Sequence, residues 1–198
     1  MDVPGRFSRN AGERYSSMLD YSFRDLESIG EIEFLKPRKG LRPYKCSASC
    51  GLYMCNAWRM NNNRLTNIRG IVSTAFNLLD RPEHLTWLDL SFNKITHLTN
   101  EIAMFPSLRV LYLHSNLLAE FELCLRHLVQ IGSLYSLTLH DNLLDKDVNY
   151  RNKIVLRLKQ IELLDFTRIN EEERKRVHFY GRIRGVKNVA FQRNHQLH

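Results

Sequence analysis

The sequence has few cysteines and no long apolar run, and each shortage excludes a class of protein. Four cysteines in 198 residues are too few for a disulfide-stapled scaffold. No apolar run approaches the roughly 20 residues that a membrane-spanning helix needs. The first residues are polar and charged, without the apolar stretch of a signal peptide. We therefore expect a soluble intracellular protein with reduced cysteines.

The cysteine spacing also argues against a metal site. Cys46, Cys50 and Cys55 cluster, but no two of them form a C-x-x-C pair, and no histidine precedes Glu83 to complete a ligand set. Cys124 stands alone in a segment of helical spacing, where a small buried side chain is the simplest account. We expect no metal and no cofactor.

Motifs of the common enzyme classes are also missing. The chain contains no G-x-S-x-G nucleophile elbow, no phosphate-binding P-loop and no G-x-G-x-x-G fingerprint. The hydrophobic fraction of 43% is that of an ordinary globular protein, so a packed core is expected. We expect a protein with no catalytic residues and no small-molecule substrate.

The formal net charge of +8 is concentrated at one end of the chain. Residues 171–198 hold seven Lys/Arg against three Asp/Glu, whereas 1–52 and 53–170 each have an excess of only two. A basic tail favours acidic partners such as nucleic acid, anionic lipid or the surface of tubulin, and the open alternative is a solvated tail that maintains solubility. Aromatic residues among its basic residues could stack on RNA bases, but nucleic acid is not the partner we expect.

A leucine pattern recurs through the middle of the chain. L-x-x-L-x-L-x-x-N-x-L/I starts at Leu85, Leu108 and Leu134, and a degenerate copy starts at Cys55. The asparagines of the four copies are Asn63, Asn93, Asn116 and Asn142, spaced 30, 23 and 26 residues apart. This pattern, with a period of about 20 to 29 residues, is the signature of a leucine-rich repeat. We assign the excess of the longest interval to residues 77–83.

Each copy of the pattern predicts a strand, a turn and a helical return. The last two leucines are two residues apart, so both point inward from a short strand, and neighbouring strands pair in parallel about 4.8 Å apart. The turn leaves buried backbone donors and acceptors that a stack of asparagine amides can satisfy. The return segments carry apolar residues at roughly helical spacing, which we interpret as core: Ile95, Leu98 and Ile102, then Leu118, Phe121, Leu125 and Leu128.

The predicted fold class is α/β, a short solenoid with a parallel concave sheet, a helical C-terminal cap and extended arms at both ends. We divide the chain into an extended N-terminal arm over 1–52, repeats over 53–147, a cap over 148–177 and a basic tail over 178–198. The cap should contain a helical stretch with Ile154, Val155 and Leu158, then a last strand over 161–169 with Phe166 facing the core. Asn170 should then cap a charged helix.

Several stretches resemble the leucine-rich repeat-containing protein 51 family, and the cap resembles that of phosphatase-regulator-type repeats. Outside the repeats these stretches are 19–24 (LDYSFR) and 40–43 (GLRP), and inside them they include 61–63, 88–93, 110–114 and 137–140. The resemblance implies a cytoplasmic, structural component of the ciliary or flagellar axoneme, part of the cytoskeleton. Its implied partners are axonemal or microtubule-associated proteins, tubulin among the candidates.

Two other functions stay open at this point. The first is a soluble cytoplasmic adaptor or phosphatase-regulator-like scaffold, which would use the concave face and leave the arms dispensable. The second is an RNA-bound splicing-type protein, favoured only by the basic tail. Neither the composition nor the repeat distinguishes the three.

The outward positions of the strands predict where a partner binds. They form three columns: Ala57, Trp87, Val110, Ser136 and Leu163; Arg59, Asp89, Tyr112, Thr138 and Asp165; Asn61, Ser91, His114, His140 and Thr167. Large aromatic side chains anchor interfaces at low entropic cost. We therefore predict that the partner-binding residues are Arg59, Trp87, Asp89, Val110, Tyr112, His114, Thr138 and His140.

Two alternatives concern this surface. The N-terminal arm could fold back and cover it. His114 and His140 occupy one column of adjacent strands about 5 Å apart, so they could instead form a metal pair or a pH-sensitive spot. We favour histidines that contact a partner, because no fixed set of neighbouring ligands is evident.

Overall fold

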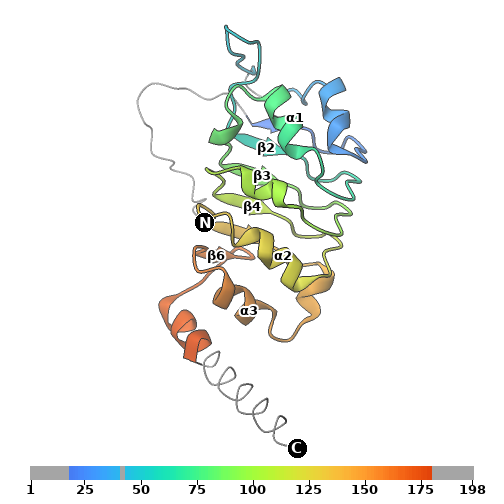
Figure 1. Ribbon diagram of the computed structural model, residues 1–198. Helices are drawn as coiled ribbons and strands as arrows, with labels where there is room; N and C mark the ends of the chain where they lie inside the picture. Colours follow the sequence, from blue (N-terminus) through green and yellow to red (C-terminus); the bar gives the residue numbers. More distant parts are fainter. Residues whose placement is uncertain (1–17, 41–42, 180–198) are drawn as a thin grey trace, which may run out of the picture.

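The computed structural model describes residues 18–40 and 43–179, and the expectations for the first 17 residues and for the tail beyond Phe179 lie outside this range. Figure 1 shows strands stacked along one side of an elongated coil and helices α1, α2 and α3 along the other. Within the described residues the strands form one sheet in chain order. The fold is thus the predicted α/β solenoid.

The elements are short, as expected for a tightly wound coil. The strands are β1 (Leu19–Asp20), β2 (Ala57–Arg59), β3 (Trp87–Asp89), β4 (Val110–Tyr112), β5 (Ser136–Thr138), β6 (Leu163–Leu164) and β7 (Thr167–Arg168). The α-helices are α1 (Ile71–Leu78), α2 (Phe121–Leu128) and α3 (Tyr150–Arg157), and residues 171–179 are also helical. The 3-10 helices are η1 (Ile29–Phe34), η2 (Pro82–His84), η3 (Asn100–Met104) and η4 (Leu143–Lys146). No helix in this part of the chain has the length and apolarity to cross a membrane.

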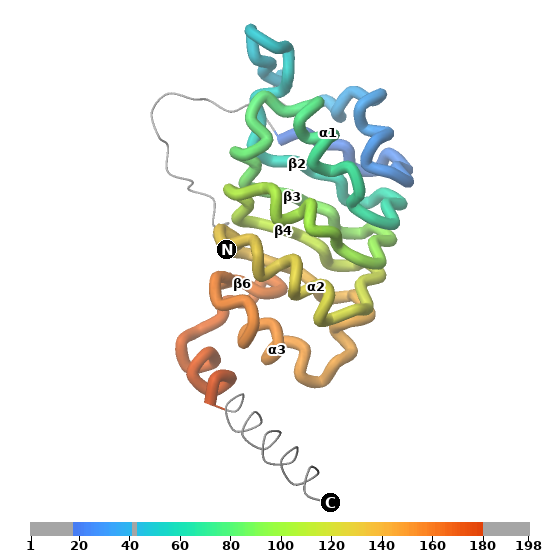
Figure 2. The backbone as a smooth tube through the Cα atoms, in the orientation of Figure 1, coloured from blue at the N-terminus to red at the C-terminus, as the bar shows by residue number. Residues whose placement is uncertain are grey.

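The strand register follows the leucine pattern. Trp58, Leu88, Leu111 and Leu137 are paired along the parallel strands β2 to β5, and all four are fully buried. The residues predicted as core in the return segments are also buried, except Phe121, which is half-buried. Figure 2 shows the successive turns stacked from the blue end to the orange end. The core is thus one continuous column between the sheet and the helices.

The predicted asparagine ladder is present. Asn116 shows its chemistry: Oδ1 accepts from Ile95 N at 3.0 Å, and Nδ2 donates to the carbonyl oxygens of Leu90 and Leu113, each at 3.0 Å. The equivalent bonds of the other three asparagines also join each turn to the one before it. Each amide therefore satisfies buried backbone groups of two successive repeats.

The residue before each ladder asparagine has a left-handed backbone conformation. These residues are Asn62, Phe92, Ser115 and Asp141, with φ between 53° and 55°. Phe23, with φ 55°, takes the equivalent position before Arg24. A phenylalanine at positive φ is uncommon, because a bulky Cβ substituent crowds the backbone there. These tight turns thus hold two exposed phenylalanine side chains, Phe23 and Phe92.

Residues 19–35 form a repeat of the solenoid, so the prediction of an extended arm is wrong for them. Strand β1 pairs in parallel with β2, and Leu19, Tyr21 and Leu26 are buried. The segment keeps the phase of the repeat, with Arg24 where asparagine is expected. Among the described residues no turn precedes this one, so a ladder asparagine would have no earlier carbonyl groups to bind there, and Asn63 already accepts from the nitrogens of Arg24 and Leu26. That substitution hid the repeat.

The start of the coil is closed by segments that follow β1. In η1, Glu33 Oε1 accepts from Thr74 Oγ1 at 3.2 Å and from Asn77 Nδ2 at 3.0 Å, which fixes η1 against α1. Arg38 N donates to Asp20 O at 2.7 Å and so covers the outer edge of β1. The described part of the expected arm therefore lengthens the sheet instead of folding across the concave face.

The cap differs from the prediction at Phe166. Ile154, Val155 and Leu158 are buried as expected, but Phe166 is 61% exposed. Asp165 and Phe166 have φ of 51° and 61°, so the chain reverses and β7 runs antiparallel to β6. This reversal aims Phe166 out of the core.

Asn170 begins the terminal helix as predicted. Its Oδ1 accepts from Glu173 N at 2.8 Å, and the Glu173 carboxylate also binds Arg151 through two hydrogen bonds.

We expect Asn170→Ala to lower the free energy of unfolding by about 1 kcal/mol, because one helix donor loses its acceptor. Urea unfolding against Asn152→Ala, an exposed position of α3, measures this. Equal stability of the two variants would contradict the capping role.

Candidate protein-binding surface

The predicted columns lie side by side on the concave face. Ala57, Trp87, Val110, Ser136 and Leu163 are paired in one row across β2 to β6. Arg59, Asp89, Tyr112 and Thr138 form the next row. In the third, the rings of His114 and His140 stack with centroids 4.7 Å apart and an interplanar angle of 7°. The predicted spacing of the histidine pair is confirmed.

Aromatic rings make a continuous strip across these columns. We use the name aromatic strip for Trp87, Phe92, Tyr112, His114, His140 and Phe166. The Trp87 and Tyr112 centroids are 5.5 Å apart, and Phe166 lies 5.5 to 5.8 Å from Tyr112, His114 and His140. Phe92 reaches the strip through His114 at 5.2 Å. These edge-to-face contacts order the rings while leaving area for a partner.

Two members of the strip, Phe166 and Phe92, are not predicted by the sequence pattern. The repeat spacing predicts Phe166 in the core, and only the absence of an asparagine after it signals that the repeat has ended. Phe92 comes directly before ladder Asn93, at a turn position that faces neither the core nor the sheet. A phenylalanine at such a position has no packing role, and this signal could have identified it.

Two residues predicted to bind a partner are buried instead. Thr138 is fully buried, and its Oγ1 shares a hydrogen bond with His114 Nδ1 at 2.8 Å. Asp89 is 6% exposed, and its Oδ1 accepts from Ser91 N and Ser91 Oγ. Thr138 thus positions the His114 ring, whereas Asp89 holds the backbone and hydroxyl of Ser91. Arg59, Trp87, Val110, Tyr112, His114 and His140 are partly exposed, as a contact surface requires.

Asp165 joins the strip to the cap. One carboxylate oxygen accepts from Leu139 N at 2.7 Å and His140 N at 3.1 Å, and it lies 3.2 Å from His140 Nδ1. The other accepts from the hydroxyl of Tyr150 at 2.9 Å. Burial and the nearby carboxylate raise the pKa of Tyr150, which therefore stays a neutral donor. The carboxylate thus fixes one histidine and α3 together.

His114 is held in its neutral form. Burial and the neighbouring His140 lower its pKa, and they outweigh the attraction of Asp89, Asp141 and Asp165. Because the folded-state pKa is below that of the unfolded chain, this group stabilises the fold above about pH 6.5, and the effect is lost as the pH falls towards the folded-state pKa.

A titration tests this electrostatic picture. We expect His140→Gln to raise the pKa of His114, because the substitution removes a neighbouring group that is charged at low pH. NMR of the His114 imidazole across about pH 4.5 to 8 measures it. An unchanged or lower pKa of His114 in the variant would show that His140 does not set it.

The surface has no evident catalytic chemistry. Within the described residues no three His, Cys, Asp or Glu side chains are grouped to hold a metal ion. The parallel rings of His114 and His140 do not aim their nitrogens at a common point. Burial raises the pKa of Cys124 to about 12, so this cysteine is a protonated core residue; Cys55 is also buried, whereas Cys46 and Cys50 are exposed.

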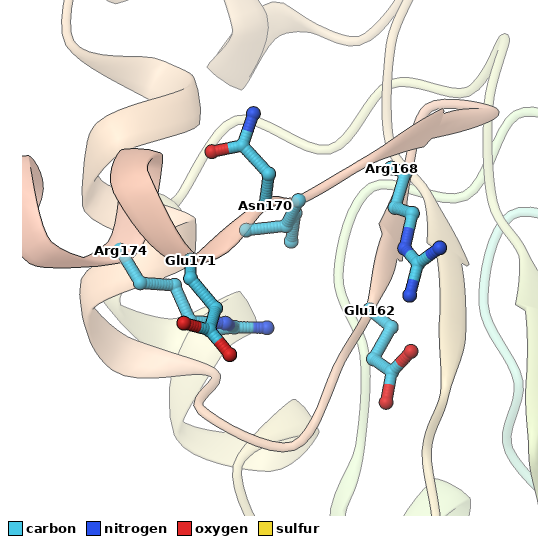
Figure 3. A pocket seen from close by; sticks show the side chains of 6 residues that line it. Glu162, Arg168, Asn170, Glu171 and Arg174 are labelled. Carbon is cyan, nitrogen blue, oxygen red and sulfur yellow. The ribbon is translucent and has the colours of Figure 1, made fainter.

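A small pocket lies beside the cap, between β7 and the helix over 171–179 (Figure 3). Its volume is about 380 Å³, and it is lined by Glu162, Arg168, Ile169, Asn170, Glu171 and Arg174. Of the two arginines that line the pocket, Arg174 already donates a hydrogen bond from Nη2 to Ile161 O. The lining mixes charges of both signs and offers no nucleophile.

Comparisons with known proteins agree with this architecture. The family model for the leucine-rich repeat matches residues 60–192. Leucine-rich repeat-containing protein 51 of Homo sapiens is 34% identical over 90% of this chain and 92% of its own length, and that of Pan troglodytes is 36% identical over 83% and 85%. The mouse protein of the same name is 33% identical over 85% and 86%.

Solved structures include a similar fold. A chain in the crystal structure of the Drosophila melanogaster SNF/U2A' complex has a TM-score of 0.58 and 25% identity, covering 70% of this chain and 75% of that chain. The leucine-rich repeats make this chain a scaffold for protein–protein interaction. With the matching repeats and with relatives alike over nearly their whole length, the chain belongs to the leucine-rich repeat-containing protein 51 family.

Proposed function

We propose that this chain is a non-catalytic component of the ciliary or flagellar axoneme that binds another axonemal or microtubule-associated protein through its concave face. The aromatic strip is the observation that supports binding there. Trp87 and Tyr112 are only half-buried, on a surface whose core-facing side is already filled by Leu88 and Leu111. Burying such rings against a partner gains large apolar area and needs little further ordering.

The axonemal part of the proposal rests on the family resemblance. The stretch over 19–24 is one of the two resembling stretches outside the four predicted repeats, and it forms β1 and the turn after it. Its burial against β2 gives it a structural reason to be retained. The resemblance over 40–43 includes residues outside the described range.

Extraction of ciliated cells tests the location. A tagged protein is expected to stay with the detergent-insoluble axoneme and to leave it only at high salt, because a built-in part is held by many contacts. The Trp87→Ala/Tyr112→Ala variant should shift towards the soluble fraction. A wild-type protein that washes out with the cytosol would contradict the axonemal location and favour a soluble adaptor or phosphatase-regulator-like scaffold.

A truncation shows whether the N-terminal segment contributes to binding. The deletion should end at residue 17, because residues 19–32 contribute side chains to the core. These side chains are Leu19, Tyr21, Leu26, Ile29 and Ile32. An axonemal component that also grips through this segment should lose part of its retention when residues 1–17 are deleted. An adaptor that binds through the concave face alone should not.

A further inference from the structure

We propose that the C-terminal half of the concave face receives an arginine side chain of the partner protein, held between aromatic rings and the Asp141 carboxylate. The site consists of His114, His140 and Phe166, with Asp141 at its edge and Asp165 holding the His140 ring in place. This inference rests on the proposed function, because it names the chemistry that the concave face recognises.

Two carboxylates flank His140, and only that of Asp141 is open to a ligand, because both oxygens of Asp165 already accept hydrogen bonds within the fold. Asp141 Oδ2 lies 4.0 Å from His140 Nε2, and Asp165 Oδ1 lies 3.2 Å from His140 Nδ1. Among residues 18–40 and 43–179, no lysine or arginine forms an ion pair with either one. The Asp141 side chain is 71% exposed, so a guanidinium group can reach it.

Two of the three rings beside the Asp141 carboxylate, those of His114 and Phe166, carry no positive charge at neutral pH. His114 is neutral because burial and His140 lower its pKa. Phe166 is 61% exposed and lies within 6 Å of both histidine rings. The negative faces of aromatic rings attract a cation, and a planar guanidinium also stacks on them. The rings and the Asp141 carboxylate therefore favour the same kind of ligand, a planar cation.

At the N-terminal end of the concave face, an aromatic ring and a carboxylate already hold a guanidinium group, that of Arg59. Arg59 Cζ lies 5.6 Å from the centroid of the Trp87 ring. Its Nη1 is 3.9 Å from Asp20 Oδ2. One guanidinium is thus stacked on an aromatic ring and attracted by a carboxylate from the neighbouring strand. The C-terminal half repeats the ring and the carboxylate, and the partner would supply the guanidinium.

The net positive charge of the chain opposes the binding of any cationic ligand. A net charge of +8 repels a cationic ligand at long range, so weak general attraction does not explain the binding of one. A site that accepts arginine against this repulsion must do so through local rings and the Asp141 carboxylate.

NMR of the full-length protein with a hexa-arginine peptide tests the inference. We expect saturable shifts of the His114 and His140 imidazole signals, with Kd raised about threefold to tenfold by Asp141→Asn and by Phe166→Ala. Both side chains are mostly exposed, so the fold should be kept. Glu120→Gln makes the same charge change at the exposed start of α2 and should leave Kd unchanged.

Each other result contradicts the proposal. No shift of the two histidines overturns it, as does an equal loss in Glu120→Gln, which would mean binding by overall charge. Equal binding of hexa-lysine removes the preference for arginine, and stronger binding of hexa-glutamate means an anionic partner. Failure here leaves the axonemal proposal standing if cell extraction supports it, so the two can fail separately.

Discussion

Replacing Asn116 by alanine is expected to lower the free energy of unfolding by about 2 to 6 kcal/mol. Ile95 N loses its acceptor, and a buried polar group without a partner costs about 1 to 3 kcal/mol. The carbonyl oxygens of Leu90 and Leu113 each lose one hydrogen bond, worth about 0.5 to 1.5 kcal/mol, but each keeps the bond from a neighbouring ladder asparagine. A domain of this size is stable by only about 5 to 15 kcal/mol. The variant should therefore be partly unfolded at physiological temperature, which urea titration followed by circular dichroism measures.

The matched control is Asn152→Ala, which removes the same side chain from an exposed position of α3. It should change the stability by less than about 0.5 kcal/mol. The Asn116→Asp variant keeps the acceptor for Ile95 N but loses the amide donors. Its free energy of unfolding should therefore lie between those of the wild type and Asn116→Ala. If Asn116→Ala and Asn152→Ala were equally stable, the ladder would be dispensable.

Loss of Trp87 and Tyr112 together is expected to weaken partner binding by at least about 100-fold. Central aromatic anchors commonly contribute about 2 kcal/mol or more each, and every 1.4 kcal/mol is a factor of ten in Kd. The two rings lie 5.5 Å apart, and neither is part of the buried core. The measurement is quantitative capture of axonemal proteins by the purified chain and by Trp87→Ala/Tyr112→Ala.

The control for this variant is Phe76→Ala/Met104→Ala. These two side chains are 62% and 64% exposed, on α1 and η3 on the helical side of the coil. Removing them deletes apolar surface of the same kind without touching the sheet. Equal capture by both double variants, each shown to be folded, would place the interface elsewhere.

The repeat made most of the fold predictable from the sequence. Leucines two residues apart and the four asparagines impose one register on β2 to β5, because a one-residue shift would expose Leu88, Leu111 and Leu137. The same regularity correctly placed Trp87 beside Tyr112, and His114 beside His140. A periodic pattern is thus informative about neighbours that are distant in the sequence.

The two ends of the coil were less predictable, since repeats change there. At the start, Arg24 stands where the repeat has asparagine, in the first turn of the described residues, so β1 was not predicted from the sequence. At the other end, the left-handed conformations of Asp165 and Phe166 reverse the chain. Neither residue is glycine, so the sequence lacks the usual local signal for a left-handed backbone conformation at this turn.

Side-chain exposure on the concave face depends on size as well as on strand direction. Alternation correctly put Asp89 and Thr138 on this face, but it could not show that larger rings would bury them. The strand pattern gives direction only, and the depth of a short side chain depends on its neighbours across strands. The candidate site therefore needed the structure for Phe166, whose ring completes the strip.

Site-specific photo-crosslinking tests the central claim most directly. A benzophenone amino acid is placed at Val110, half-buried between the columns of the strip, or at Met104 on the helical side, and the protein is expressed in ciliated cells. The account predicts that position 110 gives a crosslinked adduct with an axonemal protein and that position 104 gives little or none. An adduct from position 104 alone would contradict a concave partner-binding surface.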